Sequence, residues 1–254
     1  MAMVDLLLHD GVLIDGTGAE PRSRISVLIQ DGHIRKVGPV DTMARSADAR
    51  VIDLAGMTLL PGLTDAHVHL GWVGTSGIDL PSSDPDGGSL AVYAIHVIEN
   101  INIALQEGFT TVRDAGGLDP AFADVVAGEL IKGPRILPSA SFISQTGGHG
   151  DQRSRNDDSI PKPIPGLLAL PCLSDGVDSM RAAVRKQFRM GATQIKLMAS
   201  GGVMSPNDEL ESLQFTVEEM AAAVYEARAT GKYVMAHCHS SASIDNALMA
   251  GVRS

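Results

Sequence analysis

The chain has 254 residues, 44% of them hydrophobic, which is enough to bury the core of one barrel-sized domain or of two smaller ones. Its formal net charge is −10 with no basic runs, and only 4% of its residues are aromatic, which argues against a nucleic-acid partner. Two cysteines are too few for a disulfide framework, and the sequence shows neither signal-peptide features nor an apolar run of membrane length. We therefore expect a soluble, reduced, cytoplasmic protein without a membrane partner.

The first 60 residues predict short strands separated by turns. Apolar runs such as "DLLLHD", "ISVLIQ" and "RVIDL" alternate with polar turn residues. Asp31-Gly32 lies between two of these runs and is typical of a type I′ hairpin turn. We assign residues 1–58 to the N-terminal part of a small β-sandwich.

From Leu59 onward the pattern becomes apolar strand, loop and amphipathic helix, repeated. Strands are predicted from residue 59 and over 109–116, 134–144, 193–200 and 233–239. Helices are predicted within 89–107, over about 120–131 and 177–190, from a T-x-x-E capping box at Thr216 and Glu219 to before Gly231, and from about residue 241. Five strand-then-helix units in series indicate a parallel α/β fold with its chemistry at the carboxyl ends of the strands.

We assign residues 59–254 to the N-terminal five units of a (β/α)8 TIM-like barrel. A closed eight-stranded barrel typically takes about 250 residues. About five units follow residue 59, so we expect the sequence to be part of a longer protein that supplies the remaining strands.

The first barrel strand ends in "DAHVHL", with His67 and His69 two residues apart. In a strand, side chains two apart point the same way, so both imidazoles project together while Val68 points to the opposite face. Two neutral imidazoles make half of a metal site. The alternative is that both are ordinary polar loop residues, but their position at the end of a strand favours the metal site.

Lys196 lies inside the apolar strand "TQIKLMAS". A bare ammonium is costly to bury unless it is neutralised or paired. Near divalent cations its amine shifts toward the neutral form, which can add carbon dioxide to give a carbamate that bridges two metal ions. The alternative is a buried lysine paired with a carboxylate.

A second pair, His237 and His239, lies at the end of the fifth strand in "YVMAHCH". Alternation places both on one face and Cys238 on the other, which indicates that the thiol packs in the core. We favour His237 as a metal ligand and His239 as a group that contacts substrate, although the reverse assignment stays open.

His149 lies in the glycine-flanked loop "SQTGGHGD", whose backbone freedom allows the side chain to reach into a site. The alternative is a solvated loop histidine. The long connection that follows is a candidate active-site lid. Surface or core roles are expected for His9, His33 and His96.

Taken together, these motifs resemble the amidohydrolase superfamily, specifically its imidazolonepropionase-like and Xaa-Pro dipeptidase (prolidase) branch. The resemblance runs over the whole chain. It is carried by "GMTLLPGLTDAHVHL", "GFTTVRDAGG", "SQTGGHGD", "GATQIKLMASGGVMSP" and "GKYVMAHCHS".

The resemblance implies a binuclear centre of two divalent cations, with zinc the expected metal. It implies that His67 and His69 bind the more buried metal, that Lys196 is the carboxylated bridging ligand, and that His237 binds the second metal. His149 corresponds to a catalytic histidine that contacts the substrate carbonyl. The family's further metal-binding histidine, on its sixth strand, and the aspartate on its eighth strand that takes a proton from the bridging water would both lie beyond Ser254.

The implied function is hydrolysis of the amide bond of a dipeptide or an N-acyl amino acid by a metal-bridging hydroxide. Arg153 and Arg155 are candidate partners for a substrate carboxylate. The family also implies homo-oligomers. A single-metal cyclic-amide hydrolase of the imidazolonepropionase type, or a deaminase, is an alternative that needs no carboxylated lysine. A non-catalytic, truncated binding or scaffold protein is an alternative of another class.

Overall fold

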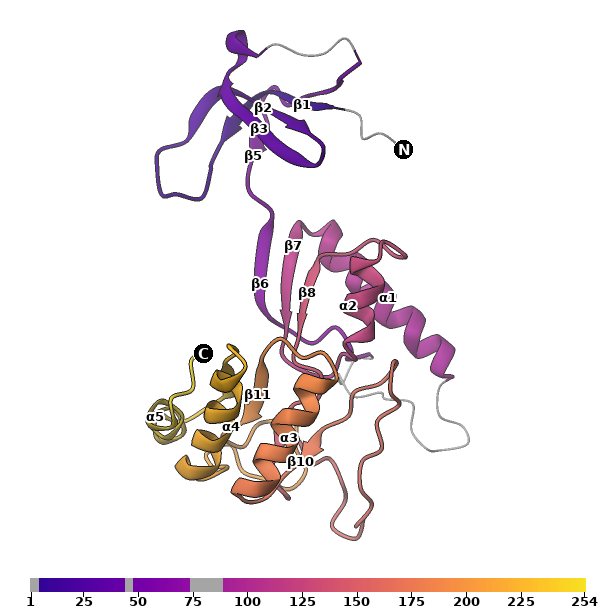
Figure 1. Cartoon of the computed structure of the whole chain (residues 1–254), viewed down its shortest axis with the longest axis vertical. Helices are drawn as coiled ribbons and strands as arrows, with labels where there is room; N and C mark the ends of the chain where they lie inside the picture. Colours follow the sequence, from indigo (N-terminus) through magenta and orange to yellow (C-terminus); the bar gives the residue numbers. More distant parts are fainter. Residues whose placement is uncertain (1–4, 44–47, 74–88) are drawn as a thin grey trace. The chain divides into compact units, whose positions relative to one another are not determined.

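A computed structural model describes residues 5–43, 48–73 and 89–254 (Figure 1). The chain divides into two compact units, Met1–Leu63 and Thr64–Ser254. No helix in the described part of the chain is long and apolar enough to cross a bilayer.

The N-terminal unit contains strands β1 (Leu6–Leu13), β2 (Arg22–Gln30), β3 (His33–Pro39), β4 (Arg50–Asp53) and β5 (Thr58–Leu59), and the short 3-10 helix η1 (Val40–Thr42). They form one sheet in the order β3-β2-β1-β4, with β5 also paired to β1. Strand β2 pairs antiparallel with β1 and β3, whereas β4 and β5 run parallel to β1.

The predicted hairpin turn between β2 and β3 is confirmed. Asp31 and Gly32 both have positive φ angles, 50° and 72°, as a type I′ turn requires. The described strands of this unit form a single five-stranded sheet, so the predicted β-sandwich is not confirmed and stays a prediction.

The C-terminal unit holds the strands of the strand-then-helix repeat. These are β6 (Leu63–Val68), which begins at the boundary between the units, β7 (Phe109–Asp114), β8 (Arg135–Pro138), β9 (Ile143–Ser144), β10 (Cys172–Leu173), β11 (Ile195–Met198) and β12 (Val234–His237). Their orders are β6-β7-β8 and β10-β9-β11-β12. The backbone N–H of Thr193 donates to the carbonyl of Pro138 at 2.7 Å and links β8 to the approach of β11.

Each predicted helix follows its strand: α1 (Leu90–Gln106), α2 (Ala121–Ala127), α3 (Val177–Arg189), α4 (Val217–Ala229) and α5 (Ser241–Ala250). The five predicted strand-then-helix units are thus confirmed. The capping box that opens α4 is present in both directions, between Thr216 and Glu219. Helix α2 is shorter than predicted because its C-cap is Gly128 and Glu129 then turns to a positive φ of 58°.

The third strand also differs from its prediction as one continuous run. It is broken into β8 and β9, and Ala140, between them, has a left-handed φ of 59° that extended backbone does not allow. The carbonyl of Ala140 accepts a hydrogen bond from the N–H of Gly117, in the loop after β7. At the break, the backbone thus forms a hydrogen bond to the loop that follows β7 instead of continuing as one strand.

Two apolar clusters hold this unit together. One packs α1 and α2 against β7 and β8 through residues such as Val97, Ile101 and Val112; the other packs α3 and α4 against β11 and β12. Figure 1 shows α1 and α2 beside β7 and β8. Helices that cover the sides of parallel strands leave the strand ends available for polar side chains.

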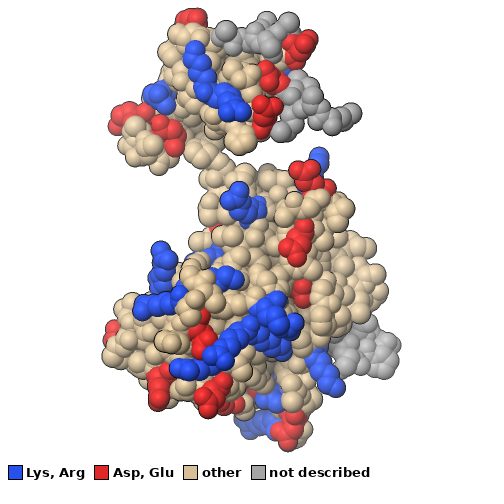
Figure 2. Space-filling view, in the orientation of Figure 1, with Lys and Arg blue, Asp and Glu red and all other residues tan. Residues whose placement is uncertain are grey.

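The last residues of the chain, 253 and 254, form backbone hydrogen bonds along the edge of strand β12. The N–H of Arg253 donates to the carbonyl of Val234, and the N–H of Ala236 donates to the carbonyl of Ser254. On the molecular face shown in Figure 2, acidic and basic side chains both occur on each unit.

Candidate metal and active site

Polar side chains from three strands of the C-terminal unit, which belong to its two sheets, lie close together. His67 is in β6, Lys196 is in β11, and His237 ends β12. The Lys196 Nζ atom lies 3.5 Å from His67 Nε2. The charge of Lys196 also lowers the pKa values of His69, His149 and His237, which places all of these groups in one electrostatic neighbourhood.

Lys196 is almost completely buried, with 1% of its surface exposed. Among the described residues, no carboxylate forms an ion pair with its amine, and its only hydrogen-bond partner is His67. Burial lowers the pKa of Lys196 to about 8, with Asp114 opposing the shift. The structure therefore does not support a lysine paired with a carboxylate, and it leaves a buried amine that loses its proton at a lower pH than an ordinary lysine does.

His67 and His69 project to the same side, with their ring centroids 5.2 Å apart. Val68, between them, packs with the apolar cluster under α1, as the strand alternation predicts. The His69 ring stacks on Trp72 at 3.9 Å, and its Nδ1 donates to the carbonyl of Gly116 at 2.9 Å. This bond leaves Nε2 as the nitrogen that can face a metal ion.

Asp114, at the end of β7, is a buried carboxyl group that the sequence did not single out. It accepts hydrogen bonds from the N–H groups of Leu70 at 2.8 Å and Gly116 at 2.9 Å. Burial raises its pKa to about 7 although these bonds favour the charged form. Asp114 thus ties the loop that carries His69 to the carbonyl that His69 contacts.

His237 and His239, at the end of β12, lie close to His149. The ring of His237 stacks on His149 at 4.5 Å and meets His239 edge-on, also at 4.5 Å. His237 Nε2 contacts the carbonyl of Gly201 at 3.2 Å, which leaves Nδ1 for another partner. Cys238 packs against the core cluster under α4, as predicted.

Burial favours the neutral form of four imidazoles, those of His67, His69, His149 and His237. It lowers the pKa of His69 and of His237 to about 4, and it also lowers the pKa values of His67 and His149. A neutral imidazole has a free lone pair, which is the form that binds metal ions.

His149 comes to the site from the loop after β9. Its Nδ1 lies 2.9 Å from Ser205 Oγ, in the loop after β11. Gly202 lies directly against the imidazole, because a Cβ atom at this position would be 2.1 Å from His149 Cε1. The "GGVMSP" run after the Lys196 strand carried the signal for this contact, since glycines allow close approach of backbone to a side chain.

Arg153 does not present a free guanidinium to the site. Its Nε and Nη2 atoms each lie 2.7 Å from an oxygen of Asp151, and its Nη1 donates to the carbonyl of Ser159. The suggestion that Arg153 binds a substrate carboxylate therefore loses its support. Arg155 is exposed and remains a candidate.

The connection predicted as a lid spans residues 151–176, and the short strand β10 (Cys172–Leu173) lies within it. Its second half is anchored: Leu168 is buried in the cluster with α1, and the N–H of Gly166 donates to Asp119 at 3.0 Å. Its first half carries the Asp151–Arg153 pair beside the His149 loop.

The donor set fits divalent cations. Within residues 5–43, 48–73 and 89–254, no three His, Cys, Asp or Glu side chains converge closely enough to hold a metal ion by themselves. The predicted set, however, includes Lys196, a buried amine that lies near neutral imidazoles and forms no ion pair with any described carboxylate. Such a group becomes a metal ligand once it is carboxylated.

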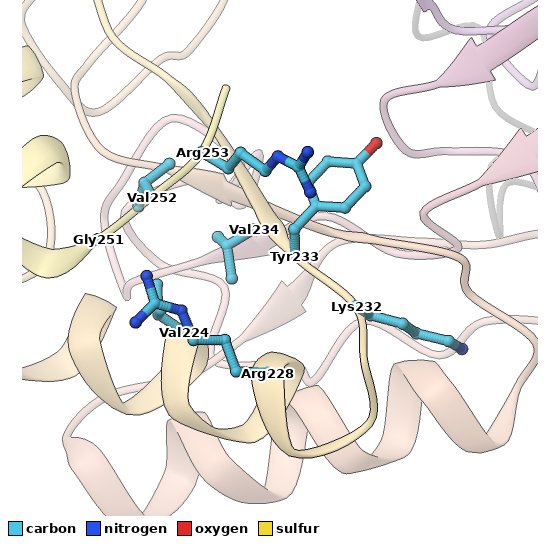
Figure 3. Close-up of a pocket in the computed structure, with 8 residues that line it drawn as sticks. All are labelled: Val224, Arg228, Lys232, Tyr233, Val234, Gly251, Val252 and Arg253. Atoms are coloured by element: carbon cyan, nitrogen blue, oxygen red, sulfur yellow. The ribbon is translucent and has the colours of Figure 1, made fainter.

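A pocket of about 440 Å³ lies elsewhere, at the start of β12 (Figure 3). In Figure 3 the guanidinium of Arg253 lies over the ring of Tyr233, at 5.4 Å from its centroid. The residues that line this pocket are Val224, Arg228, Lys232, Tyr233, Val234, Gly251, Val252 and Arg253. None of the predicted site residues is among them.

Comparison with known proteins places the chain in a family. The model of the amidohydrolase family matches residues 58–254. Ochratoxinase from Aspergillus niger is 34% identical over 261 residues, which cover 98% of this chain and 53% of that protein. The chain thus spans about half the length of this relative.

Comparison with solved structures leads to the same family. A prolidase in complex with N-methylphosphonate-L-proline is 36% identical with a TM-score of 0.87, and a Xaa-Pro dipeptidase with methionine in its active site is 33% identical with a TM-score of 0.83. Each match covers 98% of this chain and 60% of the other. The chain therefore belongs to the amidohydrolase family, as its strand-end motifs predicted.

Proposed function

We propose that this protein is a metal-dependent hydrolase that cleaves the amide bond of a dipeptide or an N-acyl amino acid. The observation that carries the proposal is the environment of Lys196: a fully buried amine, 3.5 Å from His67, with no acidic partner among the described residues. A lysine without a structural partner in an apolar strand is costly, and a ligand role accounts for that cost.

Each site residue has a role in the proposal. His67, His69 and His237 would hold two divalent cations, which we expect to be zinc, and the carbamate formed on Lys196 would lie between them. When bound, the cations would activate water and polarise the amide carbonyl. His149 would position the substrate carbonyl through its ring, and His239, which is exposed beside His237, would contact the substrate.

The substrate class is supported by the similar structures. One is a prolidase complexed with N-methylphosphonate-L-proline and another is a Xaa-Pro dipeptidase. The ligands of these two structures, N-methylphosphonate-L-proline and methionine, are amino-acid-like, and we extend that chemistry to this chain as a proposal. We also propose that the parallel strands form part of a (β/α)8 barrel, a fold with its active site at the carboxyl ends of the strands.

The proposal can be tested by assaying purified full-length protein, with zinc and bicarbonate, on a panel of Xaa-Pro dipeptides and N-acyl amino acids. Lys196→Ala should abolish hydrolysis and reduce the bound metal below two ions per chain. Lys186→Ala is the matched control, because Lys186 is exposed on α3 and its replacement should change neither quantity.

Full hydrolysis by Lys196→Ala would contradict the proposal. One metal ion per chain, together with activity on cyclic amides, would favour the single-metal alternative. Two bound metals without hydrolysis of any panel member would retain the metal site and reject the substrate class.

A further inference from the structure

Three polar residues, Ser205, Asp208 and Gln214, form a closed ring of hydrogen bonds with His149. One oxygen of the Asp208 carboxylate accepts from the hydroxyl of Ser205, and the other accepts from the amide Nε2 of Gln214 at 2.5 Å. Ser205 Oγ lies 2.9 Å from His149 Nδ1, and Gln214 Oε1 accepts from the backbone N–H of His149 at 2.9 Å. Asp208 is therefore connected to both the ring and the backbone of His149.

The direction of the hydrogen bonds in this ring can be worked out. A backbone N–H can only donate, so Gln214 must present its oxygen to His149 and its NH₂ group to Asp208. A carboxylate can only accept, so the single hydroxyl hydrogen of Ser205 goes to Asp208. Ser205 Oγ can then only accept from His149, and the hydrogen of that bond must be on Nδ1.

The other contacts of Ser205, His149 and Gln214 agree with these hydrogen-bond directions. Among the residues that the structure describes, the one further partner of the Ser205 hydroxyl is the carbonyl of Gly202 at 3.3 Å, which also accepts. Gly202 lies directly against the imidazole of His149. Gln214 is buried, with 2% of its surface exposed, so its amide cannot exchange partners with water easily.

We propose that Asp208 and Ser205 are positioning residues that hold neutral His149 in its Nδ1–H tautomer. In this form Nε2 carries a lone pair and accepts a hydrogen bond or a proton, and it can donate to a substrate carbonyl only after it has taken up a proton. The tautomer assignment stands on the hydrogen-bond geometry; its consequence for catalysis rests on the proposed function of His149.

Asp208→Asn gives the sharpest test. Gln214 keeps its orientation because of the His149 N–H, so the new amide must turn its oxygen to Gln214 and its NH₂ group to Ser205. Ser205 then accepts from that NH₂ group, and its own hydrogen is free for His149 Nδ1, its nearest acceptor at 2.9 Å. The substitution should therefore reverse the tautomer without removing a side chain.

The measurement is nitrogen-15 NMR of histidine-labelled full-length protein, at a pH where the ring is neutral, with and without added zinc. His149→Gln identifies the signals. We expect wild-type His149 to be mainly Nδ1–H, and this fraction to fall below one half in Asp208→Asn and to fall in Ser205→Ala. Ser205→Thr, which keeps the hydroxyl, should retain the wild-type tautomer, as should Glu209→Gln, an exposed carboxylate on the same loop.

A bare Nδ1 in the wild type, or an unchanged Nδ1–H fraction in Asp208→Asn, would overturn the proposal. Hydrolysis of the panel is measured in parallel, so that the positioning role and the proposed function are tested separately. If the tautomer reverses but no variant or wild type hydrolyses the panel, the positioning role stands and the proposed function fails.

Discussion

Replacement of Lys196 by methionine should stabilise the metal-free protein. Burial lowers the pKa of this lysine from 10.5 to about 8, so its charged form is disfavoured in the folded chain. One pKa unit corresponds to about 1.4 kcal/mol, so the charged amine costs roughly 3 kcal/mol of folding free energy at pH 7. Methionine fills a similar volume without a charge.

The sign of the pH dependence follows from the same shift. Below about pH 8 the lysine is charged in both states and the full cost applies. Between about pH 8 and 10.5 the unfolded chain binds more protons than the folded chain, so wild-type stability rises by about 1.4 kcal/mol per pH unit. The advantage of the methionine variant should therefore be largest at pH 7 and shrink steadily above pH 8.

The assay is urea unfolding of metal-free wild type, Lys196→Met and the exposed control Lys186→Met at pH 7 and at pH 9.5. The control should stay within about 0.5 kcal/mol of wild type, as surface substitutions do. A loss of more than about 1 kcal/mol in Lys196→Met at pH 7 would refute the reasoning, because it would show that the amine has a stabilising partner in the fold. With zinc and bicarbonate present the order should reverse, since only the wild type gains binding energy.

Three other changes test particular contacts. Gly202→Ala should abolish hydrolysis while circular dichroism stays native, because the new methyl group would displace the His149 ring. Asp114→Ala should lower the free energy of unfolding by several kcal/mol, since each buried N–H left without its acceptor costs about 1–3 kcal/mol. Glu226→Gln should destabilise the α3–α4 contact, where Arg185 holds the Glu226 pKa below its usual range. That pair contributes above the ordinary pKa of a glutamate, so wild type and variant should converge in urea midpoint as the pH falls through the lowered folded value.

Controls separate these effects from general loss of stability. Gly38→Ala introduces a methyl group with only ordinary contacts and should leave hydrolysis unchanged. Glu218→Gln removes a carboxylate from an exposed position of α4 and should show no such convergence with pH. Wild-type hydrolysis by Gly202→Ala, native stability in Asp114→Ala, or a pH-independent gap for Glu226→Gln would each contradict its prediction.

The sequence by itself determined the features that depend on local periodicity. Strand alternation put His67 and His69 on one face and Val68 on the other, and the T-x-x-E pattern fixed the start of α4. These follow from backbone geometry within a few residues, so a single element carries all the information. The repeat of strand and helix likewise predicted that polar strand ends would meet.

Only the tertiary structure decided what each polar group contacts. Nothing in the strand "TQIKLMAS" could show that Lys196 is buried and forms no ion pair with a carboxylate of the described residues. Asp208, Ser205 and Gln214 lie 56 to 65 residues from His149 in sequence, and they meet it because packing brings the loops after β9 and β11 together. The break of the third strand at Ala140 has the same origin, a hydrogen bond to Gly117 on a neighbouring loop. Contacts between distant loops depend on the packed arrangement of all the strands, which no local pattern encodes.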